Sequence, residues 1–133
     1  IDAVIKLLKP GDEVISTNDL YGGTYRLFTK IFEGFGIKFH FTGMQTAHEV
    51  EKLVNANTKL IWVETPTNPM MNVVDIAEMA NVANKYKLLL AVDNTFATPY
   101  LQQPLNLGAD IVMHSATKYL GGHSDILGGA LMT

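Results

Sequence analysis

Leu88-Leu89-Leu90-Ala91-Val92-Asp93 is the stretch that decides the fold. It is an apolar run that ends in a carboxylate, and it lacks the alternation of apolar and polar residues that marks a half-exposed strand. Such a run predicts a strand buried on both faces, which requires helices on both sides of a sheet. The run is far too short to cross a bilayer. We therefore expect an α/β fold, with a mostly parallel sheet flanked by helices.

Short apolar runs and amphipathic segments alternate along the rest of the chain, as they do where right-handed β-α-β crossovers build a parallel sheet. Thr24, Thr46 and Asp75 are expected to cap three helices at their N-terminal ends. Two prolines make residues 64–69 an irregular loop. The expected strands are 13–16, 37–41, 59–63, 88–92, 111–114 and 126–132, and the expected helices are 2–9, 24–35, 46–55 and 75–87.

The composition excludes several classes of protein. With 133 residues, 47% of them hydrophobic, and a net charge of -3, the chain is an ordinary soluble domain. No basic cluster indicates a nucleic-acid partner, and no segment indicates a membrane anchor or a secretory signal, so we expect a cytoplasmic protein. There is no cysteine, which excludes disulfides, thiolate metal sites and a catalytic thiol. The four histidines lack the close spacing of a metal site.

Both ends of the sequence look cut. Residues 1–9 have helical apolar spacing from the first residue, with no initiator Met and no capping residue before them. Residues 129–133 stop within an expected strand. We therefore expect residues 1–133 to be a piece of a longer protein.

Polar side chains follow the ends of several expected strands. In open α/β sheets, ligands bind in the crevice at the carboxyl ends of the strands, so side chains that are distant in the sequence meet there. We expect these side chains to share one site. In chain order they are Tyr21, Glu64, Asn68, Asp93, Ser115, Thr117 and Lys118.

Lys118 and Asp93 carry the chemistry of this predicted site. A lone lysine is usually a solvated surface cation, and a lone aspartate in a loop is usually a helix cap. Together they are what a protein must supply to pyridoxal phosphate: an amine that forms an imine with the aldehyde, and a carboxylate that keeps the pyridine nitrogen protonated. The pairing therefore predicts a pyridoxal phosphate enzyme.

The other candidates each have a plainer alternative. Ser115 and Thr117 either cap a helix or donate to the cofactor phosphate. Tyr21 is either a core or surface aromatic, or its ring stacks on the cofactor. Asn68 either shapes its turn or donates to the phenolic oxygen, and Glu64 is a structural carboxylate behind the ring.

Several ordered motifs extend this prediction. The chain resembles the Cys/Met-metabolism pyridoxal phosphate enzymes, which include cystathionine γ-synthase, cystathionine γ-lyase, cystathionine β-lyase and methionine γ-lyase. The resemblance covers essentially the whole chain. It implies that residues 1–133 are the central part of the cofactor-binding large domain of a fold-type I enzyme, with an N-terminal segment and a C-terminal domain absent. It also implies one antiparallel strand, which we assign to residues 126–132. The motifs are Tyr21-Gly22-Gly23-Thr24, Glu64-Thr65-Pro66-Thr67-Asn68-Pro69, Asp93-Asn94-Thr95-Phe96, Ser115-Ala116-Thr117-Lys118-Tyr119 and Gly122-His123-Ser124-Asp125.

The resemblance also implies a role for each candidate residue. The implied catalytic residues are Lys118, Tyr21 and Asp93, and the same three residues are implied to bind the cofactor. The implied contacts are Lys118 with the aldehyde, Asp93 with the pyridine nitrogen, Ser115 and Thr117 with the phosphate, Tyr21 with the ring face and Asn68 with the phenolic oxygen, while Glu64 lies behind the ring.

Gly23 and Ser124 narrow the resemblance, because methionine γ-lyases carry a cysteine and a glycine at these positions. The sequence therefore favours γ-elimination or γ-replacement on a sulfur amino acid, as in cystathionine γ-lyase or γ-synthase. O-acetylhomoserine sulfhydrylase, methionine γ-lyase and cystathionine β-lyase stay open as alternatives. The family implies a parent that is a homotetramer of active dimers, with this chain inactive alone.

Two other classes of protein fit parts of this sequence. A non-catalytic binding module could keep this fold without its chemistry, but the presence of both Lys118 and Asp93 argues against it. A nicotinamide-dependent dehydrogenase is disfavoured, because Gly22-Gly23 lacks the further glycine of a dinucleotide-binding fingerprint.

Overall fold

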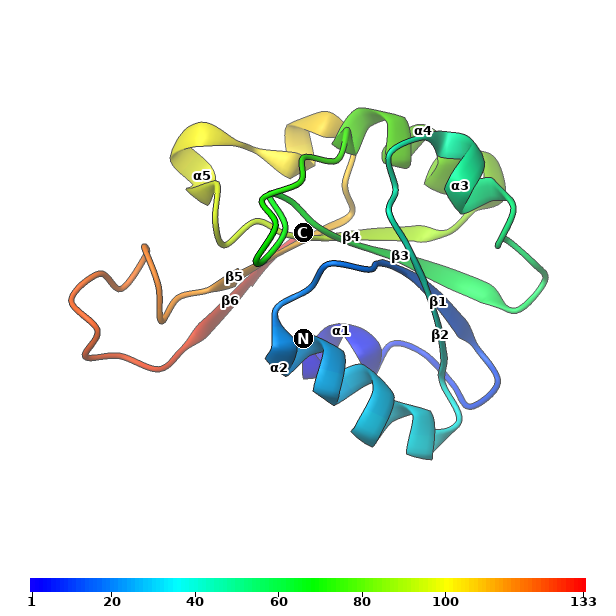
Figure 1. Ribbon diagram of the computed structural model, residues 1–133, viewed down its shortest axis with the longest axis horizontal. Helices are drawn as coiled ribbons and strands as arrows, with labels where there is room; N and C mark the ends of the chain where they lie inside the picture. Colours follow the sequence, from blue (N-terminus) through cyan, green and yellow to red (C-terminus); the bar gives the residue numbers. More distant parts are fainter.

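The computed structural model describes residues 1–133. It contains a six-stranded sheet with helices on both faces (Figure 1). The strand order is β2-β1-β3-β4-β5-β6. The first five strands are parallel, and β6 alone pairs antiparallel, with β5. The α/β prediction and the single antiparallel strand are confirmed. The strands are β1 (Glu13–Thr17), β2 (Lys38–Thr42), β3 (Thr58–Glu64), β4 (Leu89–Asp93), β5 (Ile111–Ser115) and β6 (Gly129–Met132).

Strand β4 lies between β3 and β5, and four of its five residues are buried. Its side chains alternate between two hydrophobic cores. Leu90 and Val92 pack into a cluster of 16 buried residues on one face, whereas Ala91 packs into a cluster of 13 on the other. The unbroken apolar run therefore reflects burial on both faces, as the sequence predicted.

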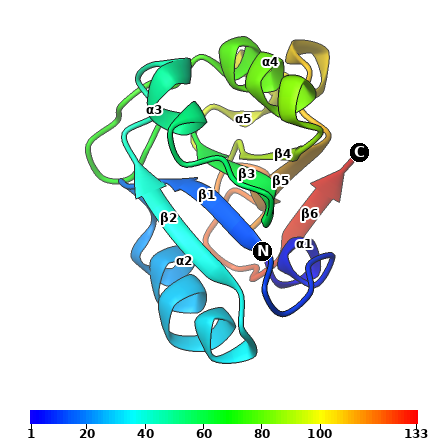
Figure 2. The same ribbon diagram turned by 90° about the vertical axis from the view of Figure 1, so that its right-hand side faces the viewer.

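Two layers of helices cover these cores. Figures 1 and 2 show α1 (Asp2–Ile5), α2 (Gly22–Arg26) and the helical residues 27–35 that follow α2 on one face of the sheet, and the helices of residues 47–107 on the other face. No helix in the chain has the length and hydrophobicity needed to span a membrane. The second layer consists of α3 (Ala47–Glu51), α4 (Ile76–Tyr86), α5 (Thr98–Leu101) and the 3-10 helix η3 (Pro104–Leu107).

The predicted caps give mixed results. Asp75 caps α4, where its carboxylate accepts a hydrogen bond from the Glu78 backbone N–H at 3.0 Å. Thr46 precedes α3 but makes no side-chain capping bond. The prediction for Thr24 is wrong: α2 begins at Gly22 with Tyr21 in the N-cap position, so Thr24 is buried inside the helix.

The helix expected at 24–35 is three short pieces. After α2 the chain continues as a π-helix, η1 (Leu27–Ile31), and a 3-10 helix, η2 (Phe32–Phe35). Gly36 ends it with a φ of 83°, in the left-handed region where glycine is least strained.

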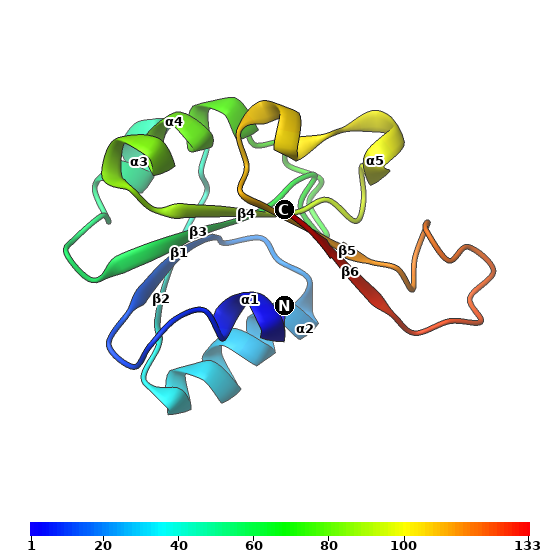
Figure 3. The same ribbon diagram turned by 180° about the vertical axis from the view of Figure 1, so that it is seen from behind.

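The strand expected at 126–132 is shorter than predicted. Only β6, at Gly129–Met132, pairs with β5, and the pairing stops where Ser115 meets Gly129. Since β5 ends there, residues 126–128 have no strand to pair with. Residues 116–128 instead form a long connection that projects from the body of the molecule (Figures 1 and 3).

Candidate active site

All the predicted site residues line one cavity. Strands β1, β3, β4 and β5 are adjacent and parallel, so their carboxyl ends meet at one edge of the sheet. The cavity at this edge has a volume of about 420 Å³, within the usual range for a small-molecule site. It is lined by Tyr21, Glu64, Asn68, Asp93, Ser115, Thr117 and Lys118, together with Pro66, Thr95, Phe96 and Leu127.

Asp93 is the last residue of β4 and is 5% exposed. Burial raises the pKa of its carboxyl group, and hydrogen bonds from Thr95 oppose that rise. The Thr95 hydroxyl donates to Asp93 Oδ1 at 2.6 Å, and the Thr95 backbone N–H donates to the same oxygen at 3.0 Å. The carboxylate is therefore held in one orientation at the cavity wall.

Thr95 is a site residue that the sequence reasoning missed. Its hydroxyl oxygen also accepts a hydrogen bond from the Ser115 backbone N–H at 2.8 Å, which ties the end of β5 to the end of β4. The two-residue spacing between Asp93 and Thr95 could have indicated this contact, because an aspartate often accepts hydrogen bonds from groups two residues further on, in an Asx turn.

Glu64 ends β3 and stands in register with Asp93 on β4. It is 5% exposed, and its two carboxylate oxygens lie 3.1 and 3.2 Å from the Tyr21 backbone nitrogen. Burial, followed by the charge of Asp93, raises the pKa of Glu64 to about 8, although the backbone N–H groups of Tyr21 and Asn68 act in the opposite direction.

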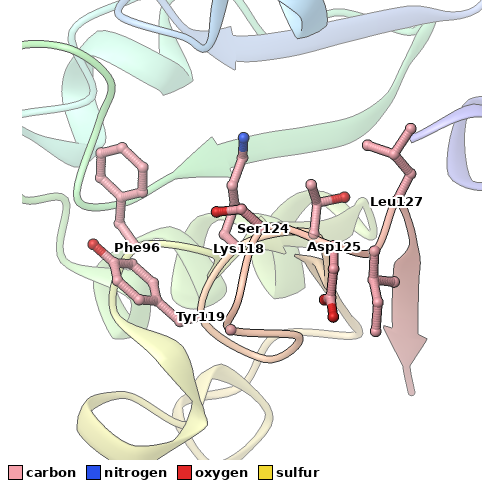
Figure 4. A pocket seen from close by; sticks show the side chains of 9 residues that line it. Phe96, Lys118, Tyr119, Ser124, Asp125 and Leu127 are labelled. Atoms are coloured by element: carbon pink, nitrogen blue, oxygen red, sulfur yellow. The ribbon is translucent and has the colours of Figure 1, made fainter.

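Lys118 lies at the rim of the site and is exposed in this chain. It lines the cavity that contains Asp93 and also a second, adjoining cavity of about 640 Å³. Figure 4 shows the second cavity, where the side chains of Lys118 and Asp125 point in opposite directions. The Lys118 amine forms no ion pair with any carboxylate of the chain.

The two predicted phosphate ligands differ in their surroundings. Ser115 is half-buried at the end of β5. The Thr117 hydroxyl donates to the Gly128 carbonyl at 3.3 Å and accepts from the Gly128 N–H at 3.0 Å. The hydroxyl proton of Thr117 therefore points to Gly128, at the other end of the projecting 116–128 connection. The sequence did not predict this contact.

Tyr21 and Asn68 also line the cavity. Tyr21 is 51% exposed, and its ring lies against Gly23 so closely that a Cβ at position 23 would overlap it. Asn68 is half-buried in the loop after β3, which contains two cis peptide bonds. Asp19 holds that loop by accepting hydrogen bonds from the Thr67 hydroxyl and the Met70 N–H.

The side chains of this site fit pyridoxal phosphate. The cavity presents an unpaired amine, a buried carboxylate that lacks a cationic partner, and an aromatic ring at one wall. These groups match an aldehyde, a ring nitrogen that carries a proton, and a flat ring face. No group of three or more His, Asp or Glu side chains is placed to hold a metal ion.

Comparison with known proteins identifies the family. The family described as Cys/Met metabolism PLP-dependent enzyme matches residues 1–133. The chain belongs to this family. Pyridoxal phosphate is accordingly the family's cofactor, as the predicted pairing of Lys118 and Asp93 required.

Individual relatives show how closely this chain follows the family. It is 56% identical over 133 residues to a cystathionine gamma-lyase of Bacillus subtilis, and 51% identical over 132 residues to a cystathionine gamma-synthase/O-acetylhomoserine (thiol)-lyase of the same organism. These alignments cover 100% and 99% of this chain but 35% of each relative. The chain therefore spans about a third of the length of these family members.

A solved structure shows the same fold. The cystathionine gamma-lyase of Lactobacillus plantarum, crystallised with L-serine, superposes with a TM-score of 0.98 at 47% identity. The match covers 99% of this chain and 35% of that protein. The mostly parallel sheet with flanking helices is thus the fold of this enzyme family.

Proposed function

We propose that this chain belongs to a full-length enzyme, called the parent protein below, that carries out γ-elimination or γ-replacement on a sulfur amino acid. The observation that carries the proposal is that Lys118 and Asp93, 25 positions apart in the sequence, line one cavity. The names of the relatives, a cystathionine gamma-lyase and a cystathionine gamma-synthase, support this reaction type.

Asp93 would set the electronic state of the cofactor. When bound, pyridoxal phosphate withdraws electrons from the substrate's α-carbon into its pyridine ring. The Asp93 carboxylate, held by Thr95, would keep a proton on the ring nitrogen and so maintain that withdrawal. Burial strengthens this contact, because a charge interaction is weakened less by solvent there.

Lys118 would bind the cofactor and move protons. Its Nζ atom would bind the aldehyde of the cofactor, and the same amine would be placed to accept the α-proton of the substrate. Its side chain is exposed and lines both adjoining cavities. Tyr21 would cover one face of the ring and move a proton through its phenol.

The remaining side chains would orient the cofactor. Ser115 and Thr117 would donate to its phosphate, and this would require the Thr117 hydroxyl to turn from the Gly128 carbonyl. Asn68 would donate to the phenolic oxygen. Each of these residues lines the cavity, which is the support for the assignment.

Cystathionine γ-lyase or γ-synthase is the reaction type we favour, with O-acetylhomoserine sulfhydrylase, methionine γ-lyase and cystathionine β-lyase as alternatives. We also propose that the parent protein is a homotetramer of active dimers. Tyr100 and Leu127 are 91% and 93% exposed in this chain, and the rest of the parent protein or a partner subunit would cover them.

An assay of the parent protein tests the reaction type. It would be incubated with cystathionine in one reaction, and with cysteine plus an activated homoserine in another. Cysteine and ketobutyrate released from cystathionine indicate the γ-lyase, and cystathionine formed in the second reaction indicates the γ-synthase. The proposed function is wrong if the wild type forms neither product and so cannot be distinguished from a Lys118→Ala variant.

A further inference from the structure

Glu64 is a buried carboxylate to which the proposed chemistry assigns no step. It is the last residue of β3 and is 5% exposed. Its own backbone N–H donates to the Thr17 hydroxyl at the end of β1, at 3.2 Å, so the position of the residue is fixed from two strands. A buried ionisable side chain is costly to fold and therefore needs a compensating contact.

That contact comes from backbone N–H groups, with Tyr21 contributing more than Asn68. Both oxygens of Glu64 lie close to the Tyr21 nitrogen, at 3.1 and 3.2 Å, and 43 positions of sequence separate the two residues. No cation of the chain pairs with Glu64, and its charged neighbours are the carboxylates of Asp93 and Asp19. Glu64 is thus placed to hold a backbone rather than to neutralise a positive side chain.

Tyr21 has few other restraints. Its ring is half exposed, and it stands at the N-cap position of α2, where the chain turns from a loop into a helix. Its carbonyl oxygen accepts the Tyr25 N–H at 3.1 Å, and Gly23 leaves space for the ring but offers no side chain to hold it. The Glu64 carboxylate is the side chain that holds the Tyr21 backbone N–H, at the point where the ring leaves the chain.

We propose that Glu64 is a positioning residue that fixes the backbone of Tyr21 at the start of α2 and so holds the Tyr21 ring at the cavity wall. The inference rests on the proposed function in one respect, since the ring is taken to face pyridoxal phosphate. It adds a residue that acts through Tyr21 and touches no reacting atom.

The test compares Glu64→Ala, Glu64→Gln and a control in the parent protein. Pyridoxal phosphate is titrated in, and its affinity and its visible circular dichroism are measured, because the dichroism reports how the ring is held. Glu64→Ala should weaken binding about tenfold and reduce the dichroism, since it removes the acceptor of the Tyr21 N–H. Glu64→Gln keeps one acceptor oxygen and should restore most of both signals.

Glu78→Ala is the matched control. Glu78 accepts a hydrogen bond from the Ala47 backbone N–H at the start of α3, at 2.7 Å, and it does not line the cavity. Glu78 therefore resembles Glu64 in accepting a hydrogen bond from a backbone N–H at the start of a helix, but it lies outside the cavity. Its loss should lower thermal stability while leaving cofactor affinity and dichroism at wild-type values.

A double variant separates positioning from general damage. If Glu64 acts through the Tyr21 ring, Glu64→Ala should add little to the loss in cofactor affinity in a Tyr21→Ala background. Additive losses would overturn the inference, and so would a Glu64→Ala protein that keeps wild-type affinity and dichroism. The proposed function fails separately, if the wild-type parent protein itself shows no imine absorbance with pyridoxal phosphate.

Discussion

Glu64 and Asp93 stand directly opposite each other, in register, at the carboxyl ends of the neighbouring parallel strands β3 and β4. Both are buried, and each is held by a different partner: Glu64 by the Tyr21 backbone and Asp93 by Thr95. Two carboxylates so placed repel each other when both are ionised. The cavity they line is therefore suited to a ligand that brings a positive charge, such as a protonated pyridine ring.

The Glu64–Asp93 pair should make the stability of the cofactor-free protein depend on pH. The pKa of Glu64 is raised from 4.5 to about 8, so the folded state binds the proton more tightly than the unfolded state does. The free energy of unfolding should then decrease as pH rises from about 4.5 to about 8. Urea unfolding across that range should show a shallower decrease for Glu64→Gln.

Glu13→Gln is the control for this pH dependence. Hydrogen bonds from Asn55 and His40 lower the pKa of Glu13, so its contribution to stability is present at neutral pH and is lost as pH falls below its ordinary range. Glu13→Gln should destabilise the protein at neutral pH without flattening the decrease between pH 4.5 and 8. If Glu64→Gln leaves the slope unchanged, Glu64 does not titrate as described.

Asp93→Asn should impair chemistry more than cofactor binding. The amide keeps the size of the side chain but cannot hold a proton on the ring nitrogen. Because a hydrogen bond to a charged group contributes roughly 1.5–3 kcal/mol, we expect turnover to fall at least about tenfold in a steady-state assay. Asp110→Asn is the comparison, since Asp110 accepts from the Leu90 N–H near the other end of β4. Equal losses in the two variants would contradict the role of Asp93.

Gly23→Ala should displace the Tyr21 ring. A Cβ at position 23 would overlap Cε1 of that ring, which is half exposed and therefore free to turn away. We expect cofactor affinity to fall about two- to tenfold, the usual range for losing one aromatic contact. Gly34→Ala is the control, because a Cβ there meets no atom within 4 Å. Unchanged affinity in Gly23→Ala would show that the ring does not contact the cofactor.

Asp75→Ala tests the best-defined helix cap. Loss of its bond to the Glu78 N–H should lower the free energy of unfolding by about 1 kcal/mol, as measured by thermal or urea denaturation. Thr46→Ala should cost less, because Thr46 makes no capping bond. The reverse order of the two effects would contradict the cap assignments.

Much of the fold could be predicted because burial leaves a clear pattern in the sequence. The apolar run that ends at Asp93 requires cover on both faces, and this alone indicates a parallel sheet. The site followed from topology, because residues after parallel strands meet at one edge. Seven residues chosen on that basis line one cavity.

The missed features depend on backbone geometry that residue types do not encode. Thr24 has the side chain of a good cap, yet the helix starts two residues earlier and buries it. The bonds of Thr117 to Gly128 arise only when β5 and β6 pair. The length of β6 likewise depends on where β5 ends, and residues 126–128 are apolar enough to resemble a strand.

The most direct test of the central claim is to reduce the parent protein with borohydride in the presence of pyridoxal phosphate and to map the labelled peptide. We expect one stable phosphopyridoxyl label per chain, on Lys118. A label on another lysine such as Lys59, or no label at all, would contradict the proposal that Lys118 and Asp93 hold this cofactor between them.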